Sequence, residues 1–164
     1  MSPRAEFIVY SLTAAAALTV AVVLLMDVDR RTPGMAELAS ALRLMPAAML
    51  AAGPGAWFVA RWHARASAAG HRWKTGGMTL RLLLVVFLLL PFAIAAGAVA
   101  AAGIDPVVTS RPAGFAQALG WLPVIVFYGS LAALLFGAVP LFVLEYFACR
   151  RYLRRQAVPS TDHA

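Results

Sequence analysis

Few residues of this chain could bind a metal or act as an acid, base or nucleophile. The three histidines, at positions 63, 71 and 163, and the single cysteine, Cys149, are not spaced as zinc ligands are. The histidines also do not pair on two apolar segments, as a haem held by two histidines within a membrane requires. The apolar segments contain no Ser-His-Asp arrangement and no paired carboxylates. The sequence therefore predicts no catalytic residue, no cofactor and no metal.

Glu145 is the acidic residue of the last long apolar run. A faint internal repeat places it at a depth comparable to that of Arg61, near one membrane face. A charge at that depth is costly alone, and a partner of opposite sign reduces the cost. One hypothesis is therefore a structural Arg61–Glu145 ion pair between the second and fourth apolar segments. The alternative is that Glu145 reaches water or one of Arg150 and Arg151.

Gly53, Pro54 and Gly55 lie together in the middle of the second apolar segment. Proline removes a backbone donor, so the motif predicts a kink or break in a helix. One interpretation is a discontinuous helix that lines a transport site. The other is an ordinary kink packed against a neighbouring helix. The motif lacks the Lys-Ser/Thr of a phosphate-binding loop.

Composition indicates a membrane protein. Of 164 residues, 62% are hydrophobic and 13% are charged, against about 45–50% and about 25% in soluble domains. A soluble chain of this length could not bury so much apolar surface. We therefore expect a single polytopic membrane domain over residues 1–164. The net charge of +7 lies in clusters beside apolar runs, which favours membrane topology over nucleic-acid binding.

Four apolar segments approach the roughly 20 residues that a transmembrane helix needs. The predicted fold is an all-α membrane protein whose four transmembrane helices form two hairpins, with spans at about 7–26, 44–62, 80–103 and 121–147. A cleaved signal peptide is the alternative for the first segment, but its apolar run is long and no clear cleavage site follows. Residues 156–164 are expected to form a short disordered tail.

Charge predicts the orientation. The side that holds both termini and the connection between the second and third segments would carry ten basic residues, and the other side four. The positive-inside rule then places both termini in the cytoplasm. The strong preference for arginine over lysine fits a GC-rich genome better than guanidinium chemistry. The expected location is a bacterial inner (cytoplasmic) membrane, which the chain crosses several times. Contacts with anionic lipid headgroups are expected from seven basic residues: Arg65, Arg72, Lys74, Arg150, Arg151, Arg154 and Arg155.

Small residues at four-residue spacing predict where helices pack closely in lipid. One such stripe lies on the fourth segment and another on the third, and we expect these two faces to meet. The stripes are Gly129, Ala133 and Gly137, and Ala93, Gly97 and Ala101. Homodimerisation through one stripe is the alternative.

Three functions are compatible with this pattern. The first is a small integral membrane protein without a catalytic site, acting as a scaffold, an accessory subunit or an assembly factor. The second is a small oligomeric transporter or channel built around the broken second helix. The third is a membrane enzyme that acts on lipids at the cytoplasmic face through His63, His71 and the nearby arginines. The expected partners are membrane lipids and either another membrane protein or further copies of the chain, with no nucleic acid.

Overall fold

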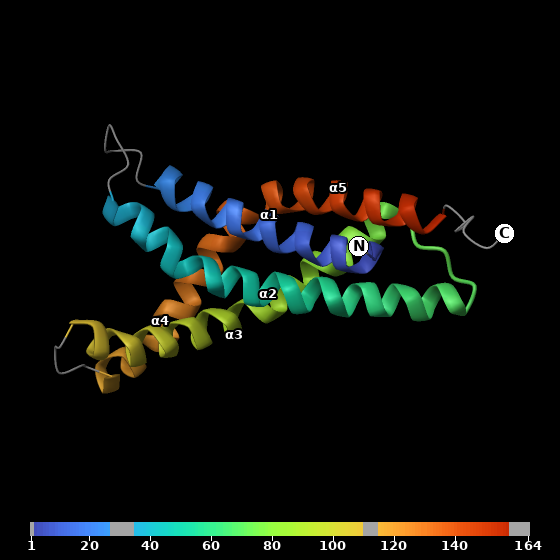
Figure 1. The fold of residues 1–164 in the computed structure, drawn as a ribbon. Coiled ribbons are helices and arrows are strands. Elements are labelled where there is room, and N and C mark those ends of the chain that lie inside the picture. The colour runs from blue at the N-terminus through green and yellow to red at the C-terminus, as the bar shows by residue number, and fades with distance from the viewer. Residues whose placement is uncertain (1, 27–34, 110–114, 158–164) are drawn as a thin grey trace.

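The computed structural model describes residues 2–26, 35–109 and 115–157, and Figure 1 shows their arrangement. The described residues are helical almost throughout and contain no strand. The elements are α1 (Pro3–Met26), α2 (Met35–Ala68), α3 (Thr75–Thr109), α4 (Phe115–Ala132), a π-helical segment η1 (Ala133–Gly137) and α5 (Ala138–Ala157). The predicted all-α class is confirmed. The predicted tail falls almost entirely outside the described residues.

Three stretches of helix are long and apolar enough to cross a membrane: Pro3–Leu24, Thr75–Ala100 and Leu119–Gln156. They correspond to the first, third and fourth predicted spans, and the helices extend beyond the predicted ends. The predicted second span lies inside α2, which is long enough but is not among these stretches. Its middle is less apolar because it carries Pro46 and the Gly53-Pro54-Gly55 motif.

The helices run alternately up and down. The start of α1, the turn between α2 and α3, and the end of α5 lie at one end of the bundle, on the right in Figure 1. This end is called the terminal end below. The predicted arrangement of two consecutive hairpins places these same three segments together. Helix α2 packs against both α1 and α3, and α5 packs against α1 and α3.

Local sequence signals set the helix ends at the terminal end. Ser2 caps α1, since its hydroxyl oxygen accepts a hydrogen bond of 3.3 Å from the Ala5 amide, and Pro3 occupies the first turn. Helix α2 ends at Ala68, and the turn after it contains Gly70, whose φ of 79° is in the left-handed region that favours glycine. The His71 amide donates to the Ala66 carbonyl at 2.9 Å, which closes the turn that leads to α3.

The Gly53-Pro54-Gly55 motif does not break the helix. Helix α2 continues through Pro54 from Met35 to Ala68, so the hypothesis of a discontinuous helix is wrong. The two glycines instead allow close helix contacts. A Cβ atom at Gly53 would lie 3.1 Å from Leu12 Cδ2 of α1, and one at Gly55 would lie 2.9 Å from Val86 Cγ2 of α3. The motif thus lets α2 lie closely between its two neighbours.

The fourth predicted span forms two inclined helices. Helix α4 runs at an angle to α5, and the change of direction occurs around η1 (Figure 1). A π-helical turn interrupts the regular hydrogen-bond pattern, and Pro140 in the following turn removes another backbone donor. These two features explain how one uninterrupted helical stretch bends. As a result α4 packs along α3, and α5 packs along α1.

The best-packed part of the bundle lies at the terminal end. Its buried side chains come from α1, α2, α3 and α5 and include Phe7, Val59, Met78, Leu82 and Cys149. The buried polar side chains belong to the same part of the structure: Ser11, His63, Thr79 and Glu145.

Candidate functional site

A buried carboxyl group is the centre of the candidate site. Glu145 of α5 is 0% exposed, and so is Ser11 of α1. The Ser11 hydroxyl donates a hydrogen bond of 2.9 Å to Glu145 Oε2, which joins two helices separated by most of the chain. The other carboxyl oxygen, Oε1, is buried and has no hydrogen-bond partner. The described structure therefore leaves half of this carboxyl group unsatisfied.

The two sequence hypotheses about Glu145 do not agree with this geometry. Arg61 is exposed and its guanidinium lies 5.3 Å from the centre of the Trp57 ring, on its own helix. Arg61 and Glu145 are therefore not brought together as an ion pair. The alternative, in which Glu145 reaches water or one of Arg150 and Arg151, is also wrong. The Glu145 side chain is fully buried, Arg150 is exposed, and Arg151 pairs with Glu6. Helical phase explains the difference: Glu145 faces α1, whereas Arg61 lies on the outer side of α2.

Two polar side chains extend the buried cluster beyond Ser11 and Glu145. Cys149 lies one helical turn after Glu145, is fully buried, and is within hydrogen-bonding reach of the Thr79 side chain of α3. Thr79 itself donates to the Thr75 carbonyl at 3.0 Å. The cluster therefore draws polar groups from α1, α3 and α5 into one buried layer. It differs from a metal centre: within the described ranges, no group of three His, Cys, Asp or Glu side chains could hold a metal ion.

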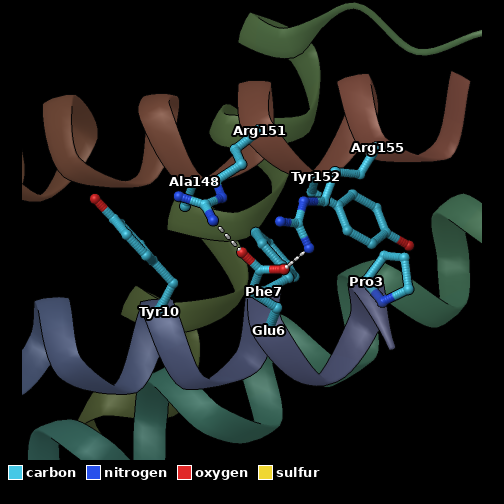
Figure 2. A pocket seen from close by; sticks show the side chains of 8 residues that line it. All are labelled: Pro3, Glu6, Phe7, Tyr10, Ala148, Arg151, Tyr152 and Arg155. Carbon is cyan, nitrogen blue, oxygen red and sulfur yellow. Dashed lines mark hydrogen bonds and ion pairs between the residues drawn. The ribbon is translucent and has the colours of Figure 1, made fainter. Parts of the chain in front are cut away.

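Glu6, an acidic residue of α1, forms ion pairs that the sequence analysis did not predict. Glu6 lies between two arginines of α5: its Oε1 is 2.7 Å from Arg151 Nη2, and its Oε2 accepts a hydrogen bond from Arg155 (Figure 2). The hollow around them has a volume of only about 10 Å³, barely enough for one water molecule. This is a closed contact between helices and has no room for a ligand.

His63 of α2 lies in an aromatic setting at the terminal end. Its ring centre is 5.3 Å from that of Trp73 and 5.7 Å from that of Tyr152, and the side chain is buried. Its Nε2 is 3.4 Å from the Ser67 hydroxyl, and Nδ1 has no partner. His71 is exposed, so the two histidines of the enzyme hypothesis occupy different environments.

Burial, and then the positive charge of Arg4, lower the pKa of His63 from its usual value of 6.5. The unfolded chain therefore binds the proton more readily than the folded protein does. Stability from this residue is complete above about pH 6.5 and is lost as the pH falls. We expect His63→Gln to flatten the acid side of the pH–stability curve, which unfolding in detergent would measure. His71→Gln is the control, and an equal effect of both variants would contradict the assignment.

The predicted small-residue stripes pack against several helices. A Cβ atom at Gly129 would lie 3.2 Å from Ile94 Cδ1, so this residue faces α3 as expected. Gly97 instead approaches Ala47 of α2, and Gly137 approaches Leu18 of α1. Ala93 is buried, and Ala133 is partly buried against the core. The side chain of Ala101 lies outside the described residues. The bend at η1 explains why one stripe meets two partners.

An apolar cavity of about 250 Å³ lies among the helices, away from the terminal end. Residues of all helical regions line it, including Leu18, Ala47, Leu90, Ile94 and Leu141. Gly53, Pro54 and Gly55 are not in its lining, so the cavity does not support the transport site that the motif suggested. An apolar cavity of this kind stays dry and accommodates apolar groups.

The seven basic residues expected to contact lipid headgroups are all exposed, in the α2–α3 turn region and in the last part of α5. Both groups lie at the terminal end, and Arg151 and Arg155 also bind Glu6. Lipid contact stays a prediction for all seven.

Sequence reasoning missed the partners of the buried cluster. Ser11 and Thr79 look like isolated hydroxyl residues that can bond to their own helix, and only Thr79 does so. Glu6 also gave no signal, because the partners on α5 are distant in sequence. Comparison with known proteins identifies no relative: no family model, no curated protein and no solved structure matches the chain.

Proposed function

We propose that this chain is an accessory subunit of a bacterial inner-membrane assembly, and that a helix of another membrane protein packs on its α3–α4 face. Both termini would lie in the cytoplasm and α2 would cross the membrane as a fourth span, as the distribution of basic residues favours. The polar contacts described above support a structural role, since Ser11–Glu145 and Glu6 with its two arginines each join α1 to α5.

One observation carries the proposal. An open groove of about 560 Å³ between α3 and α4 is lined by apolar residues such as Pro91, Pro123 and Phe127, together with Ser130. The Ser130 hydroxyl oxygen is buried and has no hydrogen-bond partner. A lipid chain cannot hydrogen-bond to this hydroxyl, whereas a polar or backbone group of a neighbouring helix can.

The surrounding surface is also uncovered. In the stretch Leu119–Gln156, 6% of the most apolar window is buried inside the structure, compared with 22% in each of the other two apolar stretches. Large side chains such as Phe127, Leu134 and Leu135 are exposed on this stretch. Lipid can cover such a surface, and so can a helix of a partner. The unpaired Ser130 hydroxyl in the groove lining is the feature that favours the partner.

Site-specific photocrosslinking tests the proposal. A photoreactive amino acid replaces Phe127, which lines the groove, in the full chain expressed in bacterial membranes. The control position is Leu84, which is exposed on α3 and does not line the groove. We expect a discrete protein adduct at position 127 and none at position 84, and Ser130→Ala should weaken it. An adduct only with a second copy, or only with lipid, would contradict the accessory role.

A further inference from the structure

We propose that Glu145 is an intramembrane proton-binding site, whose carboxyl group is held in the neutral form within the helix bundle. This goes beyond the accessory role and does not depend on it. The inference rests on the position of the carboxyl group among α1, α3 and α5 and on the hydrogen bonds that it does and does not make.

The Glu145 carboxyl group has a hydrogen-bond partner for only one of its two oxygens among the described residues. Its side chain is fully buried, as is the neighbouring Ser11 that donates to Oε2 at 2.9 Å. Oε1 is buried without a partner among the described residues. A buried carboxylate that remains ionised is expected to be paired with a cation or to accept several hydrogen bonds. One hydroxyl donor does not meet that requirement, and a bound proton removes the charge instead.

The contrast with Glu6 supports the assignment. Both acids lie on the contact between α1 and α5, but Glu6 is partly exposed and bound by Arg151 and Arg155. Those two arginines are therefore already engaged, in the last turns of α5 (Figure 2). The same contact thus holds one acid that is paired with cations and one acid that is not.

Among the described residues, none of the charged or titratable side chains around Glu145 forms an ion pair with it. On α5 the nearest in sequence are Tyr146, Cys149 and Tyr152, and Cys149 lies within hydrogen-bonding reach of the Thr79 side chain. On α1, Arg4 is within hydrogen-bonding reach of Tyr152, and Tyr10 is exposed. On α2, His63 lies against Trp73 and Tyr152, and on α3 the Arg81 guanidinium lies 4.2 Å from the centre of the Trp73 ring.

Glu145 lies one helical turn from the lining of the apolar cavity. Glu145 is one turn before Cys149 and close to the basic end of α5, and the apolar cavity reaches Leu141, one turn on the other side. The carboxyl group therefore lies within the best-packed part of the bundle, on the side that faces the apolar cavity. Proton exchange with the outside therefore requires the contact between α1 and α5 to open transiently.

Infrared difference spectroscopy of the full chain in lipid vesicles tests the proposal. The carbonyl stretch of a protonated carboxyl group should be present at neutral pH in the unaltered protein and absent from Glu145→Gln. Glutamine is nearly the same size and keeps an oxygen that accepts from Ser11, so the variant should fold. Glu6→Gln is the matched control and should leave the carbonyl band in place.

Labelling with dicyclohexylcarbodiimide, an apolar reagent that reacts with protonated carboxyl groups, provides a second measurement. Peptide mass spectrometry should find the adduct on Glu145 and not on Glu6, with labelling falling about tenfold per pH unit above the midpoint. Absence of the carbonyl band from the unaltered protein would overturn the proposal, whatever the labelling shows. Protection of Glu145 by sodium at constant pH would identify a cation as the ligand and would also overturn it.

Discussion

Replacement of Phe7 by alanine is expected to give the largest loss of stability among single substitutions in α1. The Phe7 side chain is buried at the terminal end, and its ring centre lies 5.0 Å from that of Tyr152 on α5. Phe→Ala substitutions in protein cores cost about 3–5 kcal/mol, in part because a cavity remains. Lipid lessens the hydrophobic part of this cost, so we expect about 3 kcal/mol here.

Unfolding of the full chain by sodium dodecyl sulfate in mixed micelles, followed by tryptophan fluorescence, would measure this loss. Phe92→Ala is the matched control, because Phe92 of α3 is exposed, and its truncation should change the unfolding free energy little. Similar losses for the two variants would show that Phe7 is not part of a packed contact between α1 and α5. The proposed core at the terminal end would then be wrong.

Replacement of Gly55 by valine should separate α2 from α3. A Cβ atom at this position would lie 2.9 Å from Val86 Cγ2, closer than packed side chains come, and valine adds two further carbons. Overpacking of this kind typically costs about 1–3 kcal/mol. We expect a loss of that size in the same unfolding measurement, because the clash is with the β-branched side chain of a buried residue.

Two further variants make the Gly55 result specific. Gly76→Val is the control, since nothing lies within 4 Å of a Cβ atom placed there. Val86→Ala removes the methyl group that Gly55→Val would strike, so the double variant should lose less than the sum of the two single losses. Simple additivity would mean that Gly55 matters for another reason, such as local backbone conformation, and not for close contact with α3.

The Gly53-Pro54-Gly55 motif marks a special point of α2, but it does not break the helix as one interpretation of the sequence predicted. It allows close contacts with α1 and α3 instead. Prolines and glycines in an apolar segment predict a disturbed helix, and the disturbance would suit a transporter. Here each glycine lies opposite a side chain of a neighbour, Leu12 on one side and Val86 on the other. Whether such a residue opens a helix or brings two helices together depends on these neighbours, which the local sequence does not contain.

For Glu145, the sequence indicated an unusually placed acid but not the residue that contacts it. Its place in an apolar run marks it as unusual, and cost arguments require a partner. The candidate partners by sequence were arginines, because opposite charge is the obvious remedy. The structure supplies Ser11 instead, a residue that the first helix could have bonded to itself. Small rotations of α1 and α5 decide which of these contacts forms.

The sequence by itself determined the helical class, three of the apolar segments that could cross a membrane, and the order of the helices, which places the start of α1 beside the end of α5. These features follow from segment length, hydropathy and charge, which are local properties of the chain. Only the tertiary structure decided that Glu145 is buried against Ser11, that Glu6 holds the arginines of α5, and that the fourth segment bends at η1. Those features depend on the rotation of each helix about its axis, and that rotation is set jointly by all the neighbours it packs against.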